Sequence, residues 1–242
     1  MLVSIDADTR ELQEKSFRIR YQVYCLEKGY ENPDKYPDGL EIDSFDSHSL
    51  HTLLEHRPSG CVVGTTRLVL PIAPRSEWSF PLQLVCAQNR ISTSRSFPIN
   101  ETAEVSRFCI SKQIRANRSI NSRDEKTHGA SQAALDMTIA LVEGIVRRSV
   151  EAGVTHWCAA MEPSMLRLLA RLSIYFRPFG PLVDVHGKRQ PCWQNLLVLL
   201  DRVYREQKDI WRQLTADGVH WEALQNCPTV RQRRGRDRRK ST

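Results

Sequence analysis

Residues 101–113, ETAEVSRFCISKQ, pose the question on which the fold of this chain depends. Apolar and β-branched residues favour a β-strand over residues 103–111. Glu104 and Arg107 lie inside this strand, and a buried charge costs several kcal/mol unless it is paired. The segment therefore predicts either a buried ion-pair network or the wall of a polar cleft.

Length and composition indicate a globular protein of one large domain or two small ones. The chain has 242 residues, 40% of them hydrophobic, and no run approaches the roughly 20 apolar residues that a membrane helix needs. Residues 1–15 become polar and acidic at once, unlike a signal peptide. We expect one domain over residues 1–228 and a basic tail over residues 229–242, and the sequence does not indicate an oligomeric state.

Cysteine usage predicts a reducing compartment. The seven cysteines are scattered, odd in number and free of C-x-x-C pairs, which argues against a disulfide framework and a zinc ribbon. The sequence therefore favours a cytoplasmic protein.

The net charge of +7 is concentrated in the tail. The last twelve residues, RQRRGRDRRKST, contain seven Lys/Arg and one Asp, so they carry six of the seven net positive charges. A nearly neutral body argues against specific nucleic-acid binding. The tail is either a solvated charge run or a docking segment for an acidic partner.

Periodicity predicts a mixed α/β order of elements. A first helix follows a possible capping box at Asp8 and Glu11 and ends at Gly29, and residues 112–128 read as a mobile loop. Further helices are expected near 81–87 and over 131–153, 163–173 and 201–218, and strands over 49–56, 61–70, 103–111, 154–161, 174–180, 181–187 and 195–200.

Charged residues recur inside otherwise apolar segments. They are Arg18 and Arg20 in the first helix, Asp43 and Asp46 in EIDSFD, Arg67 in CVVGTTRLVL, and Glu104 and Arg107. Structural ion pairs and a catalytic cleft both explain this pattern, because both bury charges and perturb pKa values. The residues alone leave these alternatives open.

Other candidate sites are weaker. His48 and His51 form H-x-x-H without a third zinc ligand. Cys109 lies in an apolar run, where a cysteine is more often inert than nucleophilic. The chain contains no G-x-S-x-G, P-loop or G-x-G-x-x-G motif, and QIRANR at 113–118 lacks the glycines of a pyrophosphate loop. We expect no metal site.

Taken in order, the segments RYQVY, GYE, EIDSFD, VGTTRLVLP and EVSRF resemble those of the acyl-homoserine-lactone synthases and the N-acyl amino acid synthases. Both are branches of the GNAT acyltransferase superfamily. The stretch MEPSMLRLLARLSIYFRPFGPLVDVHGKRQPCW looks more specifically like acyltransferases associated with the PEP-CTERM/exosortase system. The resemblance covers about residues 15–225 and implies an α/β GNAT fold, with a mixed central sheet flanked by helices.

The resemblance also implies a set of site residues. Glu104 would act as general base, and Asp43 and Asp46 would bind the acceptor ammonium. EVSRF would be the central strand that admits the pantetheine arm, with a bulge that brings Glu104 and Arg107 toward one network. The implied substrate-binding residues are Arg20, Tyr24, Tyr30, Arg67, Arg107, Phe108, Cys109 and Ile110.

The implied reaction moves a fatty acyl group to the amine of a small amino-acid-like acceptor. The donor would be the phosphopantetheine thioester of an acidic acyl-carrier protein, or acyl-CoA, and no permanently bound cofactor is needed. The absence of a glycine-rich loop favours the carrier protein, because that donor has no adenine-linked pyrophosphate.

Two alternatives remain. Tyr24 and Tyr30 stand where the lactone synthases typically have Phe and Trp, which disfavours S-adenosylmethionine as acceptor without excluding a lactone synthase. A GNAT-fold module that binds a ligand without catalysis is the alternative from another class.

Overall fold

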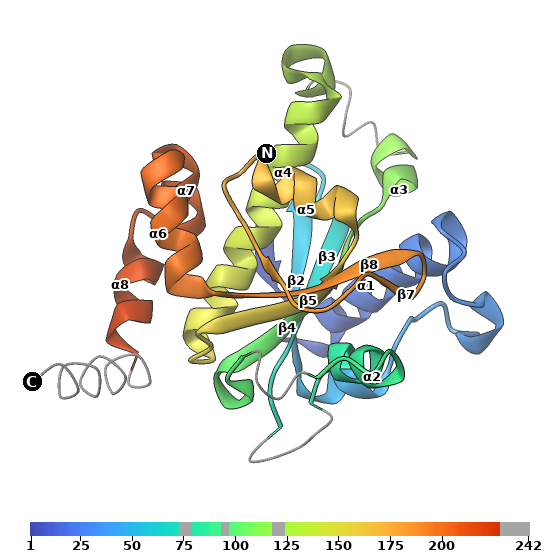
Figure 1. Ribbon diagram of the computed structural model, residues 1–242. Helices are drawn as coiled ribbons and strands as arrows, with labels where there is room; N and C mark the ends of the chain where they lie inside the picture. Colours follow the sequence, from blue (N-terminus) through green and yellow to red (C-terminus); the bar gives the residue numbers. More distant parts are fainter. Residues whose placement is uncertain (73–78, 93–96, 118–123, 228–242) are drawn as a thin grey trace, which may run out of the picture. The chain divides into compact units, whose positions relative to one another are not determined.

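The computed structural model describes residues 1–72, 79–92, 97–117 and 124–227 (Figure 1). The chain divides into two compact units. Unit 1 comprises Met1–Val69 and Val105–Ile145, and unit 2 comprises Leu70–Glu104 and Val146–Thr242. The basic tail expected over residues 229–242 lies outside the described residues, and the single domain over residues 1–228 stays a prediction.

Unit 1 is built on a sheet in which strands β1, β2, β3 and β4 are neighbours in that order. The pairs β1–β2 and β2–β3 are antiparallel, and His51 on β2 lies directly opposite Arg67 on β3. The strands are β1 (Leu2–Asp6), β2 (Ser49–His56), β3 (Cys61–Val69) and β4 (Thr102–Ile110), of which Thr102–Glu104 belong to unit 2. The helices are α1 (Arg10–Tyr21), η1 (Gln22–Glu27), η2 (Pro33–Lys35), η3 (Ser44–His48), α3 (Lys112–Asn117) and the first part of α4 (Asp124–Glu151).

Two helices cover the two faces of this sheet. Met137 and Leu141 of α4 pack against Leu54 and Val63. Ile19 of α1 and Val23 of η1 pack on the other face, against Cys109 and Val62, among others. Burial of these apolar side chains holds α1, and the arginine at position 20, against the sheet.

The first helix departs from the expected one in two respects. Thr9, not Asp8, is the N-cap, because the Thr9 side chain accepts a hydrogen bond from the Leu12 N–H at 3.3 Å. The helix then widens into a π-helical segment, η1, which carries Tyr24. Single π-turns are rare and often occur at functional sites. Gly29 follows with φ 61°, a left-handed conformation that glycine adopts without strain.

Unit 2 contains a second set of neighbouring strands, in the order β4, β5, β8 and β6, with β7 also paired to β8. Thr102–Glu104 of β4 run parallel to His156–Cys158 of β5, and the other pairs are antiparallel. The strands are β5 (His156–Met161), β6 (Arg177–Pro178), β7 (Val183–Asp184) and β8 (Lys188–Asn195). The helices are α2 (Pro81–Gln88), η4 (Ile99–Glu101), the end of α4, α5 (Pro163–Ala170), α6 (Leu196–Glu206), α7 (Lys208–Thr215) and α8 (Val219–Asn226).

The expected mixed α/β class is confirmed, but two local predictions were wrong. Residues 196–200, expected as a strand, begin helix α6, because the Asn195 side chain caps the helix by accepting from the Val198 N–H at 3.0 Å. Within the expected loop 112–128, residues 112–117 form α3 and residues 124–128 begin α4. Strands β1 and β8 and helix α8 were not predicted.

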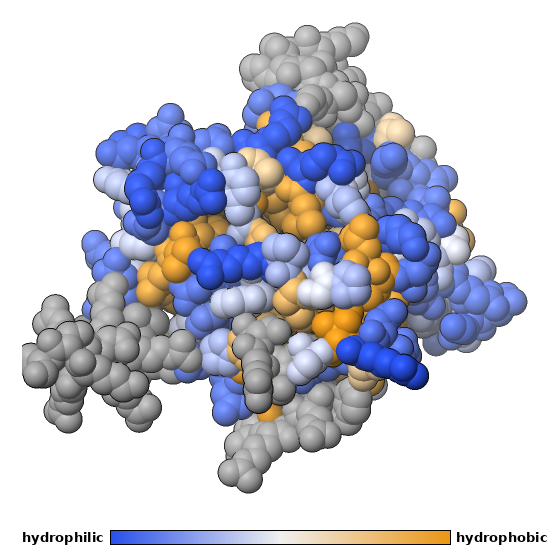
Figure 2. Space-filling model, in the orientation of Figure 1, coloured by the Kyte–Doolittle hydropathy of each residue, from blue (hydrophilic) through white to orange (hydrophobic). Residues whose placement is uncertain are grey.

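The face of the molecule drawn in Figure 2 carries both hydrophilic and hydrophobic areas. Figure 2 shows hydrophilic residues over the outward side of α6 and α7, whose arginines and carboxylates form i,i+3 and i,i+4 ion pairs. Among the helices that the structure describes, none combines the length and apolar character of a membrane span.

Candidate active site

Three arginines of unit 1 meet three carboxylates in one network. The residues, named the charged cluster below, are Arg20, Glu41, Asp43, Asp46, Arg67 and Arg107. They come from α1, from the segment that leads into and through η3, and from β3 and β4. Three positive and three negative charges balance, which is the condition for burying them together.

Arg20 forms the innermost part of the charged cluster. Its side chain is fully buried, and its Nε donates to Glu41 Oε2 at 2.5 Å. Nη1 and Nη2 donate to the two oxygens of Asp46 at 2.6 and 3.1 Å. This bidentate geometry is the strong form of an arginine–carboxylate pair and fixes both planes.

Arg67 joins β3 to both aspartates. Its Nη1 donates to Asp43 Oδ1 at 2.6 Å and to Asp46 Oδ1 at 2.9 Å, and its Nε donates to Ser106 Oγ at 3.1 Å. Asp43 and Asp46 are held in place locally by a reciprocal capping box at the start of η3. The spacing of the two aspartates is therefore set by a turn of helix and by one guanidinium.

The backbone conformation and the ion pairs of Arg107 show how strand β4 accommodates this charged residue. Its φ of 51° is left-handed, which is rare for a residue other than glycine and interrupts the alternation of β4. Consecutive side chains of a regular strand point to opposite faces, but Ser106 and Arg107 both bond to members of the charged cluster. Ser106 accepts from Arg67, and Arg107 Nη2 donates to Glu41 at 2.9 Å and to Asp43 at 3.1 Å. Arg107 is thus an irregular position in this strand, whereas a bulge that brings Glu104 and Arg107 toward one network stays a prediction.

Electrostatics keep the carboxylates ionised. Burial opposes ionisation of Glu41, but the charges of Arg20 and Arg107 outweigh it and lower the Glu41 pKa to about 2. Burial likewise opposes ionisation of Asp46. The hydrogen bond and charge of Arg20, together with the charge of Arg67, outweigh burial and hold the Asp46 pKa well below its usual range. These two groups stay anionic and are weak bases.

Glu41 was not predicted as a site residue. It is fully buried and shared by Arg20 and Arg107. A signal existed, because Glu41 precedes the apolar Ile42 in the same EIDSFD run as the two predicted aspartates. A third acid in that run balances the third arginine.

The charged cluster opens to solvent at one edge. The side chains of Asp43 and Arg107 are 26% and 24% exposed, whereas Arg20, Glu41 and Arg67 are fully buried. Arg107 also lies over the ring of Tyr24, 5.4 Å from its centroid, and Tyr24 lies 6.4 Å from Tyr30. A ligand that reaches this edge meets an aromatic ring, a guanidinium and a carboxylate.

His51 lies next to the charged cluster. Burial and the charge of Arg20 lower its pKa to about 4, so the imidazole is neutral at pH 7. Its Nε2 lies 3.6 Å from Asp46 Oδ1. Within the described residues, no group of three acidic, histidine or cysteine side chains could hold a metal ion.

Glu104 lies in unit 2 and has a contact of its own there. Its Oε2 accepts from the Leu82 N–H at 2.7 Å, in the first turn of α2. Carboxylates stabilise helix N-termini in this position. Burial, and then the charge of Glu104, raise the pKa of Cys86 to about 11 and that of Cys192 further.

The remaining predicted residues, Phe108, Cys109 and Ile110, pack in the core of unit 1. Phe108 and Ile110 contact the Leu54–Leu141 cluster, and Cys109 contacts Ile19 and Val23. Burial raises the pKa of Cys109 to about 12, which leaves a neutral thiol. Cys109 is therefore suited to packing and not to nucleophilic catalysis.

Comparisons with known proteins bear on the fold. Residues 19–123 match the model of an acetyltransferase (GNAT) domain. The AHL synthase LasI is similar in structure, with a TM-score of 0.54 and 16% identity over 80% of this chain and 88% of that one. The CoA-dependent acyl-homoserine lactone synthase BjaI, with MTA, has a TM-score of 0.56 and 23% identity, over 84% of this chain and 89% of that one. FeeM, an N-acyl amino acid synthase from uncultured soil microbes, has a TM-score of 0.51 and 14% identity, over 86% of this chain and 98% of that one. The chain therefore has the GNAT fold.

Proposed function

We propose that this protein is an N-acyltransferase that moves a fatty acyl group from a thioester to the amine of an amino-acid-like acceptor. The observation that carries the proposal is the open edge of the charged cluster. Asp43 and Arg107 are paired at 3.1 Å and partly exposed, so a carboxylate and a guanidinium stand side by side. An α-amino acid carries the complementary pair, an ammonium and a carboxylate.

The acceptor amine must lose a proton before it attacks the thioester, because free amino groups are largely protonated at neutral pH. Glu104 is proposed as the general base. Asp46 is proposed to hold Arg20 and Arg67 in position, and Asp43 to bind the ammonium. Backbone N–H groups near Phe108 to Ile110 would stabilise the oxyanion, an effect worth roughly 3–4 kcal/mol per donor in favourable cases. No covalent enzyme intermediate is required.

The proposed donor is an acyl-carrier protein, and Glu27 supports this choice. Glu27 accepts hydrogen bonds from Ser111 Oγ and from the N–H groups of Lys112 and Gln113, at 2.5, 3.1 and 3.3 Å. Backbone N–H groups at a helix start are natural ligands for phosphate. Here they are occupied by a carboxylate of the chain itself, which would repel the pyrophosphate of coenzyme A.

Two other readings compete with this one. BjaI was crystallised with SAM and isopentyl-CoA, and SAM also presents an amino-acid group, so a lactone synthase would use the same edge. A ligand-binding module without turnover would keep the charged cluster as a structural element. The PEP-CTERM/exosortase setting is proposed on the resemblance of residues 161–193 alone.

Mass spectrometry of the lipids made on heterologous expression tests the proposal. One new product mass reports the acyl chain and the acceptor together. An acylated amino acid supports the proposal, an acyl-homoserine lactone supports the lactone synthase, and the absence of any new lipid, together with no turnover of purified protein on acyl-carrier protein or acyl-CoA, contradicts both.

A further inference from the structure

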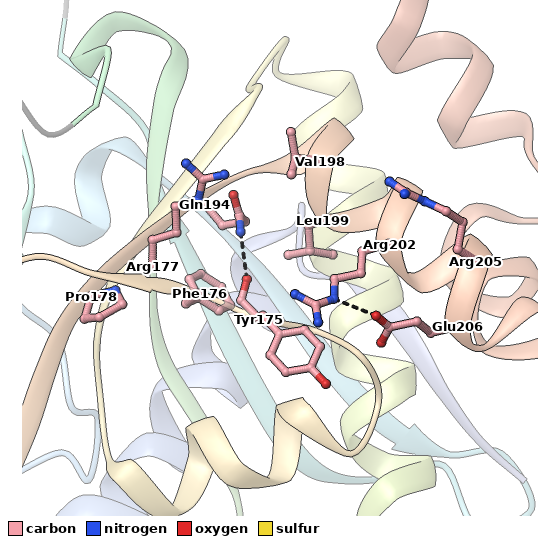
Figure 3. Close-up of a pocket in the computed structure, with 10 residues that line it drawn as sticks. All are labelled: Tyr175, Phe176, Arg177, Pro178, Gln194, Val198, Leu199, Arg202, Arg205 and Glu206. Atoms are coloured by element: carbon pink, nitrogen blue, oxygen red, sulfur yellow. Dashed lines mark hydrogen bonds and ion pairs between the residues drawn. The ribbon is translucent and has the colours of Figure 1, made fainter.

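Unit 2 contains a pocket that shares no residue with the charged cluster and that the proposed function does not use. It has a volume of about 580 Å³, within the range of small-molecule sites. Figure 3 shows residues from the segment around β6, from the end of β8 and from one side of α6 lining it. They are Tyr175, Phe176, Arg177, Pro178, Gln194, Val198, Leu199, Arg202, Arg205 and Glu206.

The polar groups of this pocket are mainly donors. The lining contains three guanidinium groups but only one carboxylate, that of Glu206. Arg202 Nε donates to Glu206 at 2.8 Å, and Arg205 pairs with Asp201. Arg177, within the described residues, has no carboxylate partner and lies over the ring of Trp193, 5.8 Å from its centroid. One guanidinium is thus left to bind an anion.

The pocket also has an apolar wall. Leu199 is buried, Phe176 lies beside it in the lining, and Val198 is 48% exposed at the mouth. The Arg202 guanidinium stacks on Tyr175 at 3.8 Å from the ring centroid, which fixes the side chain and adds a flat surface. One of the two N–H groups of the Gln194 amide is already used, because Nε2 donates to the Tyr175 carbonyl at 3.0 Å.

We propose that this pocket binds a small amphipathic carboxylate, with the carboxylate on Arg177 and the hydrocarbon part against Phe176, Val198 and Leu199. The planar guanidinium favours a carboxylate by its matching fork geometry. Two ligand sources share this chemistry, a free fatty acid and an N-acylated amino acid. The site does not depend on the proposed catalytic activity, because none of its residues belongs to the charged cluster.

Isothermal titration calorimetry of the full chain tests the proposal with four probes: decanoate, N-decanoylglycine, decanol and inorganic phosphate. We expect both carboxylates to bind, with the tighter one identifying the source, and decanol and phosphate to bind at least tenfold more weakly. Arg177→Gln should weaken decanoate binding about tenfold or more, as expected for a hydrogen bond between charged groups. Arg212→Gln, on α7 and outside the pocket, is the matched control and should change nothing.

A second variant tests the apolar wall of the pocket. Val198→Trp places an indole at the exposed mouth and should block both carboxylates while leaving the melting temperature unchanged. The proposal is overturned if neither carboxylate binds below about 1 mM, if decanol or phosphate binds as tightly as decanoate, or if Arg177→Gln and Val198→Trp bind decanoate as the wild type does.

Discussion

Asp43 and Arg107 are the two most exposed members of the charged cluster, and they are bonded to each other at 3.1 Å. Each is also held from behind by a buried partner, Asp43 by Arg67 and Arg107 by Glu41. Their positions are thus fixed before any acceptor arrives. Pre-organised charges of this kind lower the cost of binding, because little side-chain freedom remains to be lost.

Removing Arg67 should destabilise the protein strongly. Arg67→Met leaves Asp43 and Asp46 short of one positive charge in a buried site, which typically costs about 3–5 kcal/mol. Chemical denaturation measures the change, with Arg57→Met on an exposed turn as the control. An Arg67→Met protein as stable and as active as the wild type would show that the cluster needs no third arginine.

The free energy of unfolding should fall at acid pH because Glu41 becomes protonated. Its folded pKa of about 2 is below the ordinary value of 4.5, so it contributes stability that is complete above pH 4.5 and is lost as the pH falls toward 2. The contribution is on the order of 3 kcal/mol. Glu41→Gln should therefore be less stable at pH 7 and lose less stability on acidification than the wild type. Denaturation midpoints between pH 7 and 2.5 measure both, and Glu222→Gln, which is exposed on α8, should follow the wild-type curve.

Two substitutions at Glu104 separate catalysis from helix capping. Gln can still accept from the Leu82 N–H but cannot take a proton, whereas Ala loses both roles. We expect Glu104→Gln to keep the wild-type melting temperature and to lower kcat by about 10²–10⁴, with partial rescue at higher pH. Glu104→Ala should lower both stability and kcat. A Glu104→Gln protein with wild-type kcat would leave Glu104 as a cap for α2 only.

Glu27 should set the preference between donors. Glu27→Ala frees the N–H groups of Lys112 and Gln113, so kcat/KM with acyl-CoA should rise relative to that with acyl-carrier protein by about tenfold or more. The ratio of the two kcat/KM values is the readout, and Glu11→Ala, exposed on α1, is the control. An unchanged ratio would mean that Glu27 only stabilises the start of α3.

Much of the secondary structure of unit 1 could be predicted, because the sequence patterns that specify its helices and strands are local. The periodicity of α1, the β-branched run of β3 and the charges within it each predict an element or a burial conflict. Glu41 was missed because its partners, Arg20 and Arg107, lie 21 and 66 positions away and meet it only in the folded chain. The start of helix α6 was missed because a short apolar run fits a buried strand equally well, and only the Asn195 cap decides between them.

The most direct test of the account is acyl transfer by purified Asp43→Asn protein. Asn keeps the shape of Asp43 but cannot neutralise an ammonium, so we expect the KM for the amino-acid acceptor to rise at least tenfold while the KM for acyl-carrier protein stays the same. Asp34→Asn, in the exposed η2 turn, should behave as the wild type. A folded Asp43→Asn protein with an unchanged acceptor KM and kcat would contradict the proposal that the acceptor binds at the open edge of the charged cluster.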